Sequence, residues 1–156
     1  MKSRFGKINV KTVTKILNEI LQEELAGVVR YTHYSMMVYG YNRIPIVSWL
    51  REQANEALTH AQEAGELLTT MGDHPSLKIG HLLESHKHDI GDILEESLEA
   101  ESVSLELYKK LLSEVEGKNV LLEEYARKMI YAEEMHRAEV DKMLRRPGDF
   151  DSVIKK

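Results

Sequence analysis

The chain has 156 residues, of which 30% are charged and 42% are of hydrophobic types, a composition typical of one globular domain with a core. It contains no cysteine, which excludes disulfides, thiolate chemistry, iron–sulfur clusters and cysteine-based zinc sites. The net charge of -5 disfavours a protein that coats nucleic acid. Neither a run of about 18 apolar residues nor a signal-peptide core is evident, so we expect a cytoplasmic protein without membrane contact.

Apolar residues recur at helical spacing along the whole chain, and strand-type alternation is absent. In chain order, the pattern predicts helices over residues 10–40, 46–71, 85–116 and 119–146, followed by a short tail. Asn9 is a candidate cap of the first helix, and Pro45 suits the start of the second. The first and third connections are short, whereas the middle one has about a dozen residues and can run the height of the bundle. We therefore predict a single all-α domain over residues 1–156, an antiparallel four-helix bundle with a long crossover.

Polar residues interrupt the apolar stripe of every predicted helix, each near the middle of its helix. They are Glu24, His60, Glu101, Glu133 and His136. Helix midpoints share one height in an antiparallel bundle, so these side chains are expected to meet inside the core. Any one of them alone would more often be a hydrogen-bonded core residue. Three carboxylates and two imidazoles buried together need compensation, which two divalent cations such as iron, manganese or zinc would provide.

Four segments around these residues resemble the ferritin-like superfamily, and within it the bacterioferritins. The segments are NEILQEELAGVVRY, ALTHAQEAGELLTTMG, LEESLEAESVSLE and YAEEMHRAEVDKML, and the resemblance extends to about Arg146. It implies a ferritin-like bundle with a di-iron centre. Glu24 and His60 would be terminal ligands of one iron and Glu101 and His136 of the other, with Glu133 as a bridge. Tyr31 matches a tyrosine beside that centre and is the candidate catalytic residue.

The sequence departs from the bacterioferritin pattern at three points. The second bridging glutamate of the family falls at Ala57, and the neighbouring Glu56 is either a metal ligand from another direction or an exposed glutamate. The methionine that binds haem falls at Leu58, so we expect no haem. The segment after Pro147 is too short for the family's fifth helix, so a cage of 24 subunits is in doubt.

The resemblance implies an iron-binding protein that oxidises Fe(II) with O₂ or peroxide and that forms a homo-oligomer of at least two subunits, with iron storage as a further role left open. The alternative is a structural bundle with a degenerate or mononuclear site, which Ala57 suggests. A rubrerythrin-like oxidoreductase is disfavoured by the lack of cysteine. A DNA-protecting dodecamer agrees with the missing fifth helix. It disagrees with the position of the candidate ligands, which lie within one bundle and not between subunits. Metal identity, subunit number, mineral formation and the role of Glu56 stay open.

The remaining histidines carry less information. His33 lies about 180° around its predicted helix from Glu24 and is expected to face away from the centre. His74, His81, His86 and His88 fall in or near the crossover, where solvated loop histidines are expected, with a surface metal role as the alternative.

Overall fold

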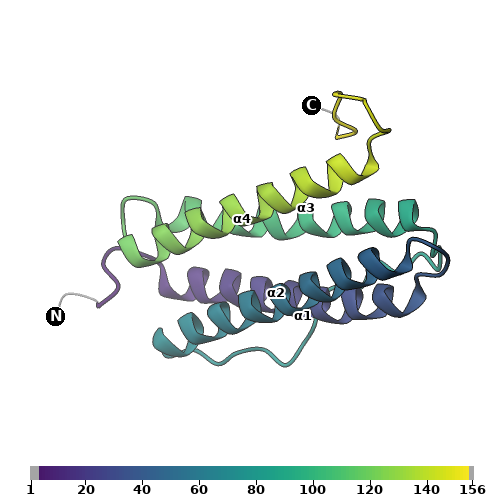
Figure 1. Ribbon diagram of the computed structural model, residues 1–156. Helices are drawn as coiled ribbons and strands as arrows, with labels where there is room; N and C mark the ends of the chain where they lie inside the picture. Colours follow the sequence, from purple (N-terminus) through teal and green to yellow (C-terminus); the bar gives the residue numbers. More distant parts are fainter. Residues whose placement is uncertain (1–3, 155–156) are drawn as a thin grey trace.

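Four long helices form the molecule in the computed structural model, which describes residues 4–154 (Figure 1). They are α1 (Val10–Met37), α2 (Arg43–Thr70), α3 (Ile90–Val115) and α4 (Val120–Leu144). Within residues 4–154 no strand occurs, so the all-α prediction is confirmed. None of these helices is long and apolar enough to cross a membrane.

Side-chain caps fix where three of the helices begin. The Asn9 side chain accepts a hydrogen bond from the Thr12 N–H at 3.1 Å, as predicted, and Asn119 caps α4 in the same way. The predicted start of the third helix at residue 85 is wrong: Asp89 caps α3 by accepting from the Gly91 N–H at 2.8 Å. The predictions for the first connection also miss by a few residues, since α1 ends at 37 and α2 begins at 43. Capping side chains decide helix ends more sharply than apolar periodicity does.

The helices form two antiparallel hairpins, α1 with α2 and α3 with α4, and the crossover between them runs along the bundle (Figure 1). This segment, residues 71–89, is longer than the expected dozen residues. Ser85 belongs to it because the next residue, His86, has a left-handed φ of 59°, which excludes a helix start there, and the Ser85 N–H donates to the buried carboxylate of Glu96 at 2.8 Å. Gly80 ties the crossover to α1 by donating its N–H to the Gln22 carbonyl at 2.8 Å. The crossover therefore lies against α1 and makes α3 run parallel to α2.

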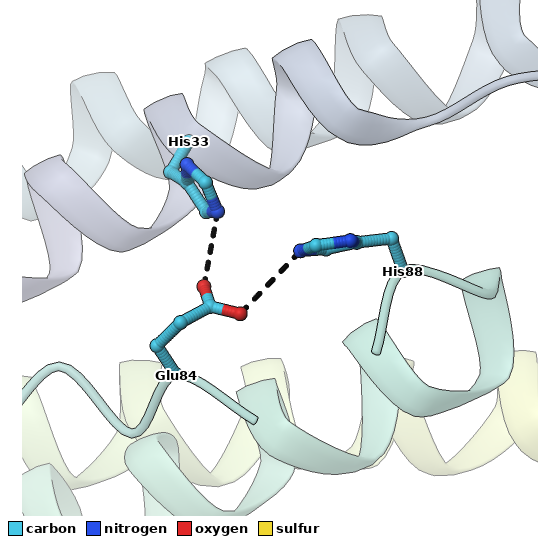
Figure 2. A group of neighbouring side chains, drawn as sticks. All are labelled: His33, Glu84 and His88. Atoms are coloured by element: carbon cyan, nitrogen blue, oxygen red, sulfur yellow. Dashed lines mark ion pairs between the residues drawn. The ribbon is translucent and has the colours of Figure 1, made fainter. Parts of the chain in front are cut away.

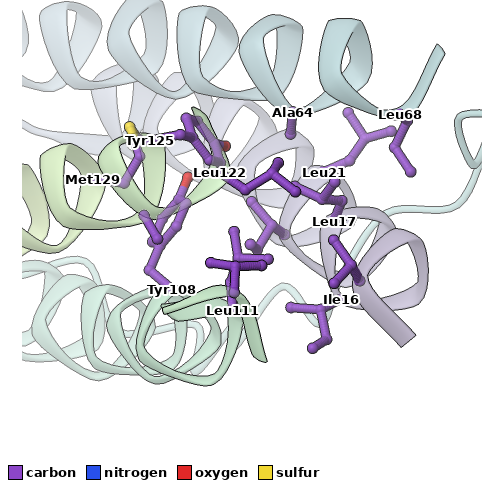
Figure 3. Close-up of a cluster of buried hydrophobic side chains, with 14 of the residues drawn as sticks. Ile16, Leu17, Leu21, Ala64, Leu68, Tyr108, Leu111, Leu122, Tyr125 and Met129 are labelled. Atoms are coloured by element: carbon purple, nitrogen blue, oxygen red, sulfur yellow. The ribbon is translucent and has the colours of Figure 1, made fainter. Parts of the chain in front are cut away.

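Two apolar clusters fill the bundle at different heights (Figure 3 shows the larger). The larger packs the N-terminal half of α1 against the C-terminal parts of α2 and α3 and the N-terminal part of α4. The smaller contains Tyr31, Tyr34, Val38, Val47, Leu50, Ala54 and Ile93. On α1 the larger cluster ends at Leu21 and the smaller begins at Tyr31. The interval between them contains Glu24, so the polar side chains lie in a layer between two apolar layers.

A buried carboxylate on α4 holds the segment that follows this helix. Asp141 accepts hydrogen bonds from the N–H groups of Val153 and Ile154, at 2.7 and 3.0 Å, and from the Ser152 hydroxyl at 2.7 Å. The Arg145 guanidinium donates to the same carboxylate at 2.8 Å. These bonds lower the pKa of Asp141 to about 2, although burial alone would raise it. The segment folds back onto α4 through this side chain and through the Arg145 guanidinium, which also donates to the Phe150 carbonyl at 2.8 Å.

Candidate metal centre

The structure brings together the five polar residues that interrupt the apolar stripes. Four of their side chains are buried, and His136 is half-buried. They lie around a space of about 20 Å³, room for little more than a water molecule or an ion. The expectation that these residues meet at one height is correct, while their role as metal ligands stays a prediction.

The five side chains divide into two groups that share Glu133, namely Glu24–His60–Glu133 and Glu101–Glu133–His136. In the first group, His60 Nδ1 lies 3.5 Å from Glu24 Oε1 and 3.5 Å from Glu133 Oε1. In the second, His136 Nδ1 lies 3.9 Å from Glu101 Oε2 and 4.0 Å from Glu133 Oε2. Each oxygen of Glu133 thus faces a different imidazole. This arrangement could bridge two cations.

Glu133 is the least compensated of these side chains. It is 2% exposed, and its Oε2 atom has no hydrogen-bond partner. Burial raises the pKa of Glu133 well above its usual range, and the nearby Glu101 and Glu24 raise it further, against the lowering effect of His60. A buried carboxylate oxygen without a partner is costly. A divalent cation between Glu133, Glu101 and His136 would remove that cost, so these residues fit a metal ion.

His60 carries the positive charge that the metal-free centre needs. Burial alone would lower the pKa of this imidazole, but the carboxylates of Glu133 and Glu24 raise it to about 10. The two carboxylates therefore favour the protonated form of the ring, which compensates part of the negative charge around it. A divalent cation bound at Nδ1 must displace this proton, because a metal ligand needs the nitrogen lone pair.

Two buried tyrosines hold the terminal carboxylates. The hydroxyl of Tyr31, on α1, donates to Glu101, and that of Tyr108, on α3, donates to Glu24 Oε1 at 2.6 Å. Burial and the adjacent carboxylate raise the pKa of each tyrosine well above its usual range, so both remain donors. From the sequence, Tyr31 is expected beside the centre, whereas Tyr108 is one residue of the apolar stripe of the predicted helix 85–116. A tyrosine on an apolar stripe could have indicated this contact, because a buried tyrosine hydroxyl usually has a hydrogen-bond partner.

Glu56 lies behind the two imidazoles and outside both groups of candidate ligands. Its Oε1 atom is 3.1 Å from His136 Nε2 and 3.9 Å from His60 Nε2. The two rings stack with centroids 6.2 Å apart and planes at 16°. Their Nδ1 atoms face the carboxylate groups while their Nε2 atoms face Glu56. The structure therefore does not bring the Glu56 carboxylate to the side of the rings that the other candidate ligands occupy.

At the position of the missing bridge, α1 and α2 approach closely. Ala57 is buried, and a Cβ atom added to Gly27 would lie 3.3 Å from the Ala57 Cβ. The small residues Gly27 and Ala57 face each other and allow the two helices to come this close. Both residues line the central space.

The helices and their central side chains define a class: an antiparallel four-helix bundle with carboxylates and imidazoles gathered at its centre. A family model described as Ferritin-like domain matches residues 14–147. The chain belongs to this family. No curated protein matches it.

The solved structures that are similar to the chain in fold include the following three. A ferritin-like diiron-carboxylate protein from Bacillus anthracis str. Ames has a TM-score of 0.79 at 23% identity, covering 87% of this chain and 97% of its own. A Rhodobacter capsulatus bacterioferritin with a metal-free dinuclear site and haem iron has a TM-score of 0.77 at 21% identity, with coverages of 92% and 86%. A dodecameric thioferritin from Bacteroides fragilis, a bacterioferritin-related protein, has a TM-score of 0.77 at 23% identity, with coverages of 88% and 87%.

Proposed function

We propose that the centre of the bundle binds two Fe²⁺ ions as substrate and oxidises them to Fe³⁺. The observation that carries the proposal is Glu133, which is buried, lacks a partner at one oxygen and faces a different imidazole with each oxygen. Carboxylate and imidazole together suit iron. The dinuclear site of the Rhodobacter capsulatus bacterioferritin and the diiron-carboxylate class of the Bacillus anthracis protein support the same choice.

In this proposal each residue has a role that follows from its contacts. Glu24 and His60 hold one iron, Glu101 and His136 hold the other, and Glu133 bridges them. Tyr31 and Tyr108 keep the terminal carboxylates in place through their hydroxyls. Two Fe²⁺ ions give one electron each. Either O₂ takes up the two electrons and two protons to form hydrogen peroxide, or hydrogen peroxide takes up two electrons and two protons to form two waters. Tyr31 is the candidate catalytic residue because its hydroxyl lies at this centre.

Glu56 acts in this proposal from outside the metal ligands. Three carboxylates facing two doubly charged ions leave a net charge of about one positive unit, because Ala57 provides no second bridge. Glu56 places a fourth negative charge next to both imidazoles. A carboxylate that accepts the outer N–H of a ligating histidine fixes the tautomer and raises the basicity of the ring. At 3.1 Å, Glu56 is within reach of the outer N–H of His136, while at 3.9 Å its charge acts on His60 without a hydrogen bond.

The direct test is the rate of Fe²⁺ oxidation in air, followed by the absorbance of the ferric product. Wild type is compared with the double variant Glu133→Ala/His136→Ala, and the control is Glu124→Ala, an exposed position on the same helix. We expect the double variant to fall to the rate of the buffer and the control to match wild type. Equal oxidation rates in all three proteins would refute the proposal.

The second candidate is a bundle with a single metal ion, which the alanine at position 57 favours. The two candidates differ in stoichiometry. Anomalous scattering from crystals soaked in Fe²⁺ without oxygen distinguishes two peaks at the centre from one, and one peak would favour the mononuclear site.

We also propose that the chain forms a homo-oligomer. Apolar side chains remain exposed near the first connection, among them Met36, Tyr39, Tyr41 and Ile44. The Bacteroides fragilis protein of similar fold is dodecameric. Solution mass by light scattering separates a monomer, which would refute the proposal, from a dimer or a cage.

A further inference from the structure

A second group of metal-ligating side chains lies outside the bundle, where the crossover meets α1 (Figure 2). His33 projects from α1, while Glu84 and His88 lie on the crossover just before α3. His33 Nε2 is 3.0 Å from Glu84 Oε2, and His88 Nε2 is 3.4 Å from Glu84 Oε1. Two imidazoles from segments far apart in the sequence therefore face one carboxylate.

The facing nitrogen atoms are shielded although the residues are near the surface. Both Nε2 atoms are buried from solvent and lack a hydrogen-bond partner, because neither pair has the N–H···O geometry of a hydrogen bond. The rings cross at 68° with centroids 5.8 Å apart, so they do not stack. This differs from the expectation of solvated loop histidines, since His88 is only 24% exposed in its side chain.

The spacing of the ligand atoms fits a small divalent cation. Zinc binds imidazole nitrogen and carboxylate oxygen at about 2.0–2.2 Å, which places neighbouring ligands of a tetrahedral site about 3.3 Å apart. The two nitrogen–oxygen distances, 3.0 and 3.4 Å, are close to that separation, and all three ligand atoms lie within 4.8 Å of one another. Two histidines and one carboxylate are a ligand set that zinc and other divalent transition metals accept.

The surroundings of Glu84 favour its ionised form and direct its side chain towards the two histidines. Burial alone would raise the pKa of Glu84, but the backbone N–H of His86 and the neighbouring imidazoles lower it below its usual range. The backbone on both sides is in the left-handed region, with φ of 57° at Leu83 and 59° at His86. Such angles are uncommon for residues with these side chains. They turn the short loop so that Glu84 faces α1.

We propose that His33, Glu84 and His88 form a second metal site, which binds one divalent transition-metal ion of the zinc type and fastens the crossover to α1. His33 lies nine residues after Glu24 on α1, about 13 Å along the helix, so the site is separate from the bundle centre. Three protein ligands leave a fourth position for solvent. The proposal does not depend on iron oxidation at the bundle centre.

The first test counts bound Zn²⁺ by competition with a chromophoric chelator, using the full chain. Glu84→Gln and His88→Ala change the crossover alone, and His74→Ala is the matched control, an exposed crossover histidine outside the group. Loss of one outer partner of a metal ligand weakens binding about 10- to 100-fold, so loss of a direct ligand is expected to weaken it about 100-fold or more. We expect one Zn²⁺ fewer in both ligand variants, with wild-type stoichiometry in the control. The same stoichiometry and affinity in all four proteins would overturn the proposal.

The second test reads the position of the ion rather than its number. Lys87 is exposed between His86 and His88, so trypsin can cleave the crossover there. We expect Zn²⁺ to slow this cleavage in wild type and in His74→Ala, and to have no effect in His33→Ala, which changes only the α1 side of the group. Equal protection of wild type and His33→Ala would place the ion elsewhere and refute the site.

Discussion

Replacing Tyr108 by phenylalanine removes one hydroxyl that serves both stability and the metal centre. The hydroxyl donates to Glu24 Oε1 at 2.6 Å, and both residues are buried. A hydrogen bond to a charged group contributes about 1.5–3 kcal/mol, so the free energy of unfolding should fall by about that amount. For a domain of this size this corresponds to a loss of roughly 3–12 °C in Tm.

The structure offers a matched control for this substitution. Tyr34 is as buried as Tyr108, and its hydroxyl donates to the buried Glu96 at the same distance, 2.6 Å, but Glu96 is not among the candidate ligands. Tyr34→Phe should therefore cost similar stability without touching the centre. Only Tyr108→Phe should weaken metal binding, by about 10- to 100-fold, since it releases the partner of a ligand.

Two measurements separate these effects. Thermal unfolding in the presence of a chelator gives the stability of the metal-free variants, and titration with Fe²⁺ without oxygen gives their affinities. We expect similar Tm values for the two variants and different affinities. Equal affinities for Tyr108→Phe and Tyr34→Phe would refute the reasoning that Tyr108 acts on a ligand.

Three further substitutions test other parts of the structure. Glu56→Gln should weaken metal binding about tenfold or more by removing the charge behind both imidazoles, whereas Glu52→Gln, exposed on the same helix, should not; equal titrations would contradict this. Ala57→Glu should lower the metal-free Tm, because it buries a carboxylate, and should tighten the binding of the two ions by supplying a second bridging carboxylate; an unchanged Fe²⁺ titration would contradict this. Asp141→Asn should speed hydrogen exchange at the Val153 and Ile154 amides and cost about 1 kcal/mol at neutral pH, after allowance for solvent screening. Because the pKa of Asp141 is lowered, to about 2, the wild type should lose this contribution as pH falls from about 4 towards 2, and the variant should not show that loss in acid unfolding.

The bundle and its central residues were predictable because both depend on helical periodicity. Residues such as Glu24 and Glu101 stood out against an apolar stripe, and a common height in the bundle follows from helix length alone. The start of α3 was not predictable in this way, since Asp89 and Ser85 both suit a helix cap, and the left-handed backbone at His86, which excludes Ser85, leaves no signal in the periodicity.

The contacts that could not be predicted from the sequence depend on the direction of single side chains or on the path of the crossover, which has no regular secondary structure. Tyr108 lies on the predicted core face, but its hydroxyl partner is 84 residues away in the chain. Glu56 was expected to be either a metal ligand or an exposed glutamate, and its position behind two rings depends on their rotation. Glu84 and His33 approach each other only because the crossover follows one particular path along α1, which no repeat in the sequence encodes.

The three buried tyrosine–glutamate bonds have a joint consequence for how the helices are aligned. Tyr108 meets Glu24, Tyr31 meets Glu101 and Tyr34 meets Glu96, so the partners ascend along α1 as they descend along α3. Antiparallel helices require that order, and each bond fixes the same register. A slip of one turn, about 5.4 Å, would leave three buried carboxylates without their donors at once. Apolar side chains tolerate such sliding far better. These bonds therefore fix the register of α1 against α3, and keep the candidate ligands of the two helices at one height before any ion binds.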